Sequence, residues 1–159
     1  MTPGYDLLLV AHVAAGVVGF GAIGASGIEA RAGRRSPDPA HDLGLRRFFR
    51  PGPDWAGRVI FLVPVLGLAL LFGGVPQDEA LAYPWAGLGI WVAATGVATG
   101  ACWPAERRAQ RALAELADGR VAEPEVLERF RSACASMERA VGVISLLFLA
   151  AVAIMIAQP

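Results

Sequence analysis

The last 20 residues of the chain, 140–159, read AVGVISLLFLAAVAIMIAQP and contain no charged side chain. Three more stretches, 7–28, 59–77 and 80–105, are also free of charge. A helix needs about 20 residues to cross the roughly 30 Å hydrocarbon core of a bilayer, where each segment must satisfy its own backbone hydrogen bonds. The sequence therefore predicts an all-α fold, a four-transmembrane-helix bundle with spans at about 5–28, 57–74, 83–103 and 138–157.

The composition excludes several other classes of protein. Hydrophobic residues make up 55% of the 159 residues and charged residues 18%, whereas soluble domains average about 25% charged. Four buried helices of a soluble bundle would show polar stripes at helical spacing, and these stretches show none. The 14 basic and 14 acidic residues cancel, so charge gives no indication of a nucleic-acid partner, and the two cysteines have no zinc-binding spacing. We expect residues 1–159 to form a single integral membrane domain.

The arginines predict the orientation in the membrane. All 14 lie in two segments, 31–58 and 107–139, while the N-terminus, residues 75–82 and the C-terminus carry none. The positive-inside rule places both arginine-rich loops in the cytoplasm and both termini outside. No positive residue precedes the first apolar run, which argues against a cleaved signal peptide.

Each inner loop is expected to contain an amphipathic cytoplasmic helix. Asp38 as N-cap and Pro39 as first helical residue predict a helix over 39–50, rich in leucine, phenylalanine and arginine. Two interpretations of it stay open, a loop held at the inner surface by its ends, or a segment that recognises lipid or a partner.

The second inner loop is expected to form a cytoplasmic helical hairpin at about 105–137. Pro104 should interrupt or kink the third span, and Gly119 should end the helix that follows it. A second helix should start at Pro124 and continue without a break into the fourth span. Its apolar stripe would pack inside the hairpin or, alternatively, bind a partner.

Small residues and one proline mark the expected helix packing in the bilayer. Gly16 and Gly19 lie in the first span, and Gly96 and Gly100 form a GxxxG pair in the third. Small side chains let helix backbones approach in lipid, so these four glycines are our packing residues, with homodimerisation through the GxxxG pair as an alternative. Pro64 frees the carbonyl of Ile60 in the second span.

His12 is the one ionisable side chain deep in a span, about 10 Å below Tyr5 and at the depth of Trp91. A neutral imidazole bonded to a neighbouring helix is one interpretation. The other is an axial ligand to a b-type haem, with Met155 or His12 of another subunit as the second ligand, and quinone contact is a third. No acid accompanies His12 for a catalytic triad or a proton relay. His41 with Asp38 and Asp42 is a weak metal signal that favours a solvated loop.

The pattern from Tyr5 through His12, Gly16 and Gly19, with the closing Met155-x-x-x-Pro159, resembles a bacterial family of predicted four-helix integral membrane proteins of unknown function. It is distantly similar to the four-helix protoporphyrinogen oxidase and copper-resistance membrane families. The resemblance implies a multi-pass protein of the bacterial cytoplasmic (inner) membrane. In the two distant families a first-helix histidine is implicated in haem or metal binding.

Two functions follow as hypotheses, because the spans carry almost no reactive groups. The first is a non-enzymatic accessory, assembly or structural subunit of a membrane complex. The second is a haem b-binding membrane redox protein or oxidase that uses His12, with Met155 and Trp91 nearby. An oligomeric transporter ranks below both, since a cation-coupled carrier would normally show a carboxylate in the membrane.

Overall fold

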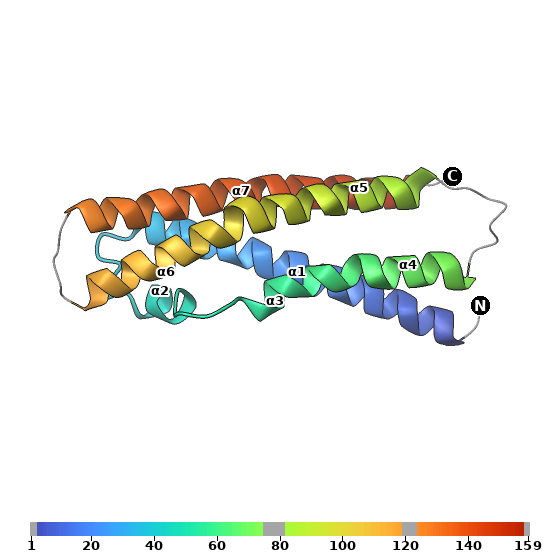
Figure 1. The fold of residues 1–159 in the computed structure, drawn as a ribbon, viewed down its shortest axis with the longest axis horizontal. Helices are drawn as coiled ribbons and strands as arrows, with labels where there is room; N and C mark the ends of the chain where they lie inside the picture. Colours follow the sequence, from blue (N-terminus) through green and yellow to red (C-terminus); the bar gives the residue numbers. More distant parts are fainter. Residues whose placement is uncertain (1–2, 75–81, 119–123, 158–159) are drawn as a thin grey trace. The chain divides into compact units, whose positions relative to one another are not determined.

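A computed structural model describes residues 3–74, 82–118 and 124–157, and every regular element in these ranges is helical (Figure 1). The elements in chain order are α1 (Pro3–Arg35), α2 (Leu43–Phe48), α3 (Trp55–Arg58), the 3-10 turn η1 (Val59–Phe61), α4 (Leu62–Gly74), α5 (Ala82–Val97), the π-helical turn η2 (Ala98–Cys102), α6 (Trp103–Ala117) and α7 (Pro124–Ile156). The predicted loop at 75–81, the helix end at Gly119 and the terminal Pro159 lie outside the described residues.

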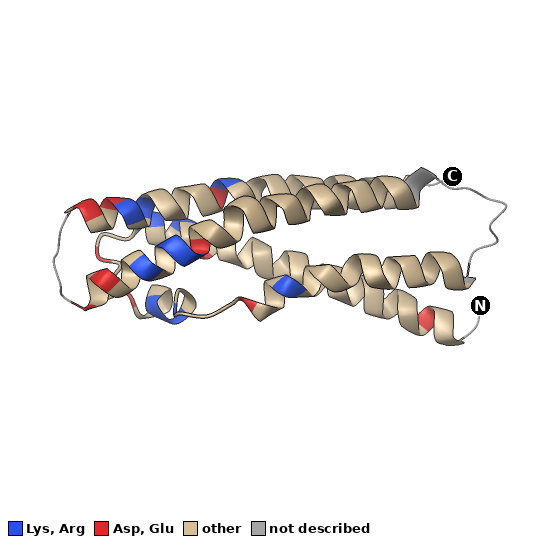
Figure 2. Cartoon of the chain, in the orientation of Figure 1, with Lys and Arg blue, Asp and Glu red and all other residues tan. Residues whose placement is uncertain are grey.

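Four helices are long and apolar enough to cross a membrane: Pro3–Arg35, Trp55–Gly73, Pro84–Ala117 and Pro124–Ile156. The predictions of an all-helical chain and of four such helices are confirmed for the described residues. Figure 2 shows no charged position in the described part of α4 or α5, whereas α2, α6 and the first half of α7 carry many. The described parts of the charge-free stretches that predicted the helices therefore lie within helices of the structure.

The first and fourth helices extend well beyond their predicted apolar spans. α1 continues to Arg35 rather than ending near residue 28, and α7 begins at Pro124 and runs unbroken to Ile156. Glu138 of α7 joins the two extensions, because its carboxylate lies 3.0 Å from Arg34 and 3.6 Å from Arg31. Arg34 and Arg35 also complement the dipole at the C-terminus of α1.

The third apolar helix is widened rather than broken ahead of Pro104. The chain passes from α5 through η2 into α6 without an interruption, and Pro104 lies in the first turn of α6. Proline has no N–H and its ring crowds the carbonyl four residues earlier, here that of Gly100. The π-helical turn at Ala98–Cys102 provides the extra width, and such turns occur as single insertions in α-helices.

The helix in the first inner loop starts later than the sequence predicted. α2 covers only Leu43–Phe48, and its N-cap is Asp42, whose side chain accepts hydrogen bonds from Gly44 N at 2.9 Å and Leu45 N at 3.2 Å. The prediction of an N-cap at Asp38 was wrong, because its carboxylate instead accepts a hydrogen bond from His41. Asp38 and Asp42 are both suitable N-cap residues, and the structure uses Asp42.

The chain divides into two compact units. The first unit contains Met1–Ile23, Asp54–Thr95 and Ser145–Pro159, and the second contains Gly24–Pro53 and Gly96–Ile144. In the second unit the core forms around Phe130, which is fully buried and meets Phe49 edge to face at a centroid distance of 5.7 Å. Gly33 of α1 makes room for this ring, since a Cβ there would lie 3.1 Å from Phe130 Cζ.

Candidate functional site

The first unit contains two side-chain hydrogen bonds to backbone carbonyls around Pro64. Pro64 cannot donate to the Ile60 carbonyl, which therefore lacks its usual helical partner. The indole of Trp91, on α5, donates to that oxygen from Nε1 at 2.9 Å. The carbonyl that Pro64 leaves without its helical donor therefore accepts a hydrogen bond that links two apolar helices.

His12 of α1 makes the second of these bonds. Its Nδ1 lies 2.9 Å from the carbonyl oxygen of Val63. A carbonyl can only accept, so we assign the proton of the neutral imidazole to Nδ1, which leaves the lone pair on Nε2. This is one of the interpretations drawn from the sequence, an imidazole bonded to a neighbouring helix.

Two glycines allow this close approach to the second apolar helix. A Cβ on Gly67 would lie 3.1 Å from His12 Cε1, so the absence of a side chain there makes room for the imidazole. A Cβ on Gly19 would lie 2.7 Å from Ile60 N and 2.9 Å from Ile60 Cα. α1 therefore packs backbone to backbone on η1 at Gly19, where the small residue is required.

We call His12, Ile60, Val63, Pro64 and Trp91 the Pro64 cluster. Trp91 makes two further contacts, one through its ring and one through its backbone carbonyl within α5. The ring of Phe61 meets Trp91 edge to face at 6.3 Å between centroids, and Thr95 Oγ1 donates to the Trp91 carbonyl at 2.7 Å. The cluster therefore fixes three helices by hydrogen bonds and ring contacts rather than by charge.

The other predicted site residues are not members of this cluster. Met155 is 51% exposed on the last turns of α7. Gly16 is half-buried, with no heavy atom within 4 Å of where its Cβ would lie. Gly96 and Gly100 are exposed, and a Cβ at either would also meet nothing within 4 Å. Two of the three residues predicted for a cofactor, His12 and Trp91, bond to backbone carbonyls of the second apolar helix. These carbonyls belong to Val63 and Ile60, which are three residues apart in the sequence.

Sequence reasoning missed Val63 and Gly67. A backbone acceptor leaves no trace in residue type, so Val63 had no signal of its own. Gly67 did have one, since it follows Pro64 by three residues in a helix otherwise rich in leucine and valine. A glycine one turn after a proline is a reason to look for a side chain from another helix.

The second unit holds ionic contacts and buried thiols. Arg129 of α7 pairs with Glu115 of α6 at 3.0 Å, and Cys102 and Cys134 are buried thiols. His41 donates from Nδ1 to Asp38 Oδ2 at 2.9 Å, and this hydrogen bond holds the pKa of the Asp38 carboxyl below its ordinary value. The stabilisation from that contact is therefore present above the ordinary aspartate pKa and is lost as pH falls through the lowered one.

The described ranges contain no group of three or more histidine, cysteine or acidic side chains able to hold a metal ion. The chemistry that the Pro64 cluster offers is that of one neutral imidazole with Nε2 as acceptor. Comparison with known protein families gives no match. Neither curated proteins nor solved structures yield a match either.

The Trp91 hydrogen bond can be tested by a double-mutant cycle with Pro64. We expect Trp91→Phe to destabilise the protein by about 1 kcal/mol, because the Ile60 carbonyl loses its side-chain donor and keeps only the N–H of Leu62. In a Pro64→Ala background the restored N–H of residue 64 can take that carbonyl, so Trp91→Phe should cost less there. Unfolding by SDS in mixed micelles measures both values.

Trp85→Phe is the matched control, since Trp85 lies on the same helix and is 61% exposed. It should change the free energy of unfolding by less than about 0.5 kcal/mol. Equal losses from Trp91→Phe in both backgrounds would show that Pro64 and Trp91 are not coupled through Ile60.

Proposed function

We propose that this chain is a multi-pass protein of a bacterial cytoplasmic membrane, with both termini outside and both arginine-rich segments inside. This proposal is supported by four apolar helices whose side chains are mostly not buried within the chain. Only 11% to 22% of the most apolar window of each long helix is buried within the chain. Apolar side chains exposed on this scale need a nonaqueous surrounding, which lipid supplies.

Within that membrane we propose an accessory, assembly or structural role in a complex of membrane proteins. The observation that carries this proposal is the exposed GxxxG pair of the second unit. Gly96 and Gly100 are exposed, and neither would bring a Cβ within 4 Å of another atom of the chain. Small residues at such spacing allow a helix of another subunit to approach closely. Thr99, next to Gly100, is also exposed.

Native gel electrophoresis of the tagged chain, extracted from its own membranes in mild detergent, tests this role. We expect a species larger than the monomer, and its loss on substitution of Gly96→Leu with Gly100→Leu. Gly142→Leu is the control, because Gly142 is exposed on α7 and also has open space at its Cβ position. A lone monomer from native membranes would contradict the proposal. A complex that survives the paired substitution would contradict the assignment to the GxxxG pair.

A haem b-binding redox protein or oxidase is the second candidate, and one observation favours it. The bond from His12 Nδ1 to the Val63 carbonyl orients the ring and leaves Nε2 free, as is usual for a ligating histidine. Open space at Gly16, one turn further along α1, is consistent with a bulky group beside it. His12 Nε2 would hold the iron, and the haem would supply one-electron redox chemistry. Met155, or His12 of a second copy, stays a prediction as the other ligand.

An absorption spectrum of protein made with haem in excess distinguishes the two candidates. A Soret band that disappears in His12→Ala and survives in the exposed-site variant His41→Ala would favour the haem protein. A colourless sample of folded protein would exclude it and leave the accessory role. The resemblance to bacterial four-helix membrane proteins and the cytoplasmic placement of the helical hairpin stay predictions.

A further inference from the structure

The second unit holds α2 in a fixed position by its apolar side. Leu45 and Phe49 are each 2% exposed, and Phe49 packs on Phe130. Asp42 caps the start of the helix. With these contacts made, the outward side of this segment consists of exposed Leu43 and exposed arginines at positions 46, 47 and 50.

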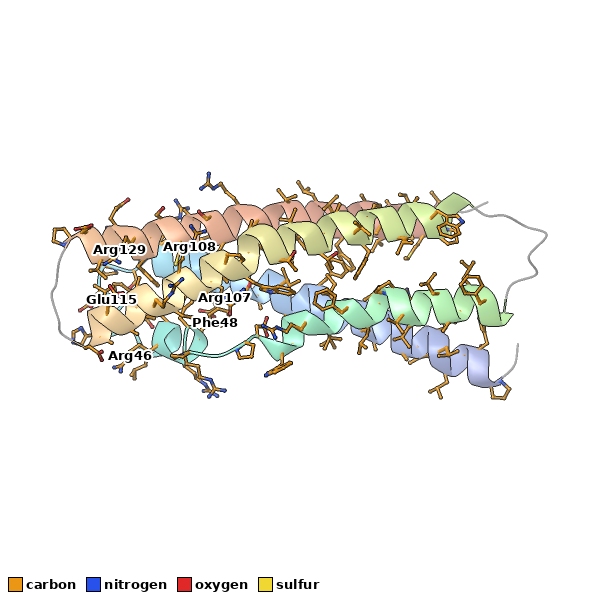
Figure 3. The ribbon with its side chains drawn as sticks, viewed as in Figure 1. Arg46, Phe48, Arg107, Arg108, Glu115 and Arg129 are labelled. Atoms are coloured by element: carbon orange, nitrogen blue, oxygen red, sulfur yellow. The ribbon has the colours of Figure 1, made fainter. Side chains whose placement is uncertain are left out.

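The beginning of α6 adds a further arginine to the same side of the second unit. Gln110 of α6 donates from Nε2 to the Gly52 carbonyl at 3.2 Å, which ties α6 to the segment that follows α2. Figure 3 shows Arg46 and Phe48 of α2 on the same side of the unit as Arg107 of α6. We call the exposed residues Arg46, Arg47, Arg50 and Arg107 the cationic face.

The side chain of Arg108 is directed along its own helix. Its Nε donates to the Pro104 carbonyl at 3.3 Å, so the guanidinium leans toward the start of α6. Arg111 makes the equivalent bond to the Arg107 carbonyl, also at 3.3 Å. These bonds use one N–H each, and the remaining guanidinium donors stay available to an external anion.

Four acids of the second unit are engaged elsewhere. Glu138 pairs with Arg31 and Arg34, and Glu115 pairs with Arg129. Asp42 accepts from the backbone of α2. Glu106 is 8% exposed and accepts a hydrogen bond from Gln110. Within the described part of the chain, no salt bridge links a carboxylate to any arginine of the cationic face, which therefore carries a net positive charge.

We infer that the cationic face binds the phosphate groups of anionic phospholipids, an inference that rests on the membrane location proposed above. Arg107 follows the apolar helix directly, within four residues of Trp103. Basic clusters beside a span attract anionic lipid, and arginine recognises phosphate with paired donors. Leu43, 79% exposed beside Arg46, supplies apolar surface for an acyl chain. An exposed leucine among arginines suits a surface that places an apolar layer beneath its phosphate groups, which is the arrangement of a phospholipid leaflet.

Native mass spectrometry of the full chain in neutral detergent, titrated with phosphatidylglycerol or phosphatidylcholine, tests the inference. We expect preferential retention of phosphatidylglycerol, and a fall in its apparent affinity of about 20-fold when Arg46→Gln and Arg107→Gln are combined. Arg46→Lys with Arg107→Lys should restore most of that affinity, because the charge returns. Retention should also weaken as salt rises.

Arg31→Gln with Arg129→Gln is the matched control, because it removes the same charge from two arginines that already pair with acids. It should lower the affinity clearly less than the test pair does. An equal fall in both would show dependence on total charge and overturn the assignment to this face, as would equal retention of the two lipids. Thermal unfolding of each variant identifies any loss of fold. A chain that stays soluble without detergent would instead contradict the membrane location itself.

Discussion

Phe130→Ala is expected to destabilise the second unit by about 3–5 kcal/mol, the largest effect we predict for a single substitution. The ring is fully buried, packs edge to face on Phe49 and lies against Gly33. Its removal leaves a cavity that joins α1, α7 and the segment carrying α2. Unfolding by denaturant measures the loss, and hydrogen exchange should show the amides of α2 opening first.

Phe72→Ala provides the control for this prediction. It deletes the same side chain from a position that is 70% exposed on α4. The expected change is below about 1 kcal/mol, since no cavity forms. If Phe130→Ala cost no more than Phe72→Ala, the core of the second unit would not be centred on Phe130.

Gly19→Ala is expected to destabilise the first unit by about 1–3 kcal/mol. The added methyl group would lie 2.7 Å from Ile60 N and 2.9 Å from Ile60 Cα. Both are backbone atoms, which cannot rotate away as a side chain can, so α1 and η1 must separate. That separation should also lengthen the bond from Trp91 to the Ile60 carbonyl, which a shift in tryptophan fluorescence would report.

Two neighbouring glycines of α1 provide controls, because their substitution by alanine should not lower the free energy of unfolding. Gly16→Ala and Gly21→Ala add a methyl group where no heavy atom lies within 4 Å. Because alanine favours a helix over glycine by up to about 1 kcal/mol, these substitutions should be neutral or stabilising. A loss at Gly16 equal to that at Gly19 would mean that helix propensity or lipid contact, rather than close packing on Ile60, decides the outcome.

The sequence predicted the four apolar helices because charge is excluded from them so completely. The predicted ends of these helices were less accurate. The segment from Glu29 to Arg35 continues α1 beyond the apolar stretch, because Glu138 of α7 pairs with two of its arginines. That acid is more than 100 residues away in the sequence, so only the folded chain reveals the contact.

Prolines were interpreted as sites where the helix changes. Pro104 was expected to interrupt or kink its helix, and the helix continues past it with the π-helical turn η2 directly before α6. Pro64 was expected to free a carbonyl, and it does, but the donor was not predictable. Trp91 was considered for a cofactor site, and its indole bonds to that carbonyl. Residue type indicates an unsatisfied group, and tertiary structure decides which side chain satisfies it.

Thiol labelling of intact cells with a membrane-impermeant maleimide tests the central proposal, a chain that crosses the membrane four times. With Cys102 and Cys134 replaced by alanine, single cysteines are placed at two exposed positions, Pro37→Cys in the first inner loop and Ala157→Cys near the C-terminus. We predict that the cysteine at 157 is labelled in intact cells and that the cysteine at 37 is labelled only after the cells are opened. Labelling of position 37 in intact cells, or protection of position 157 until lysis, would contradict the account.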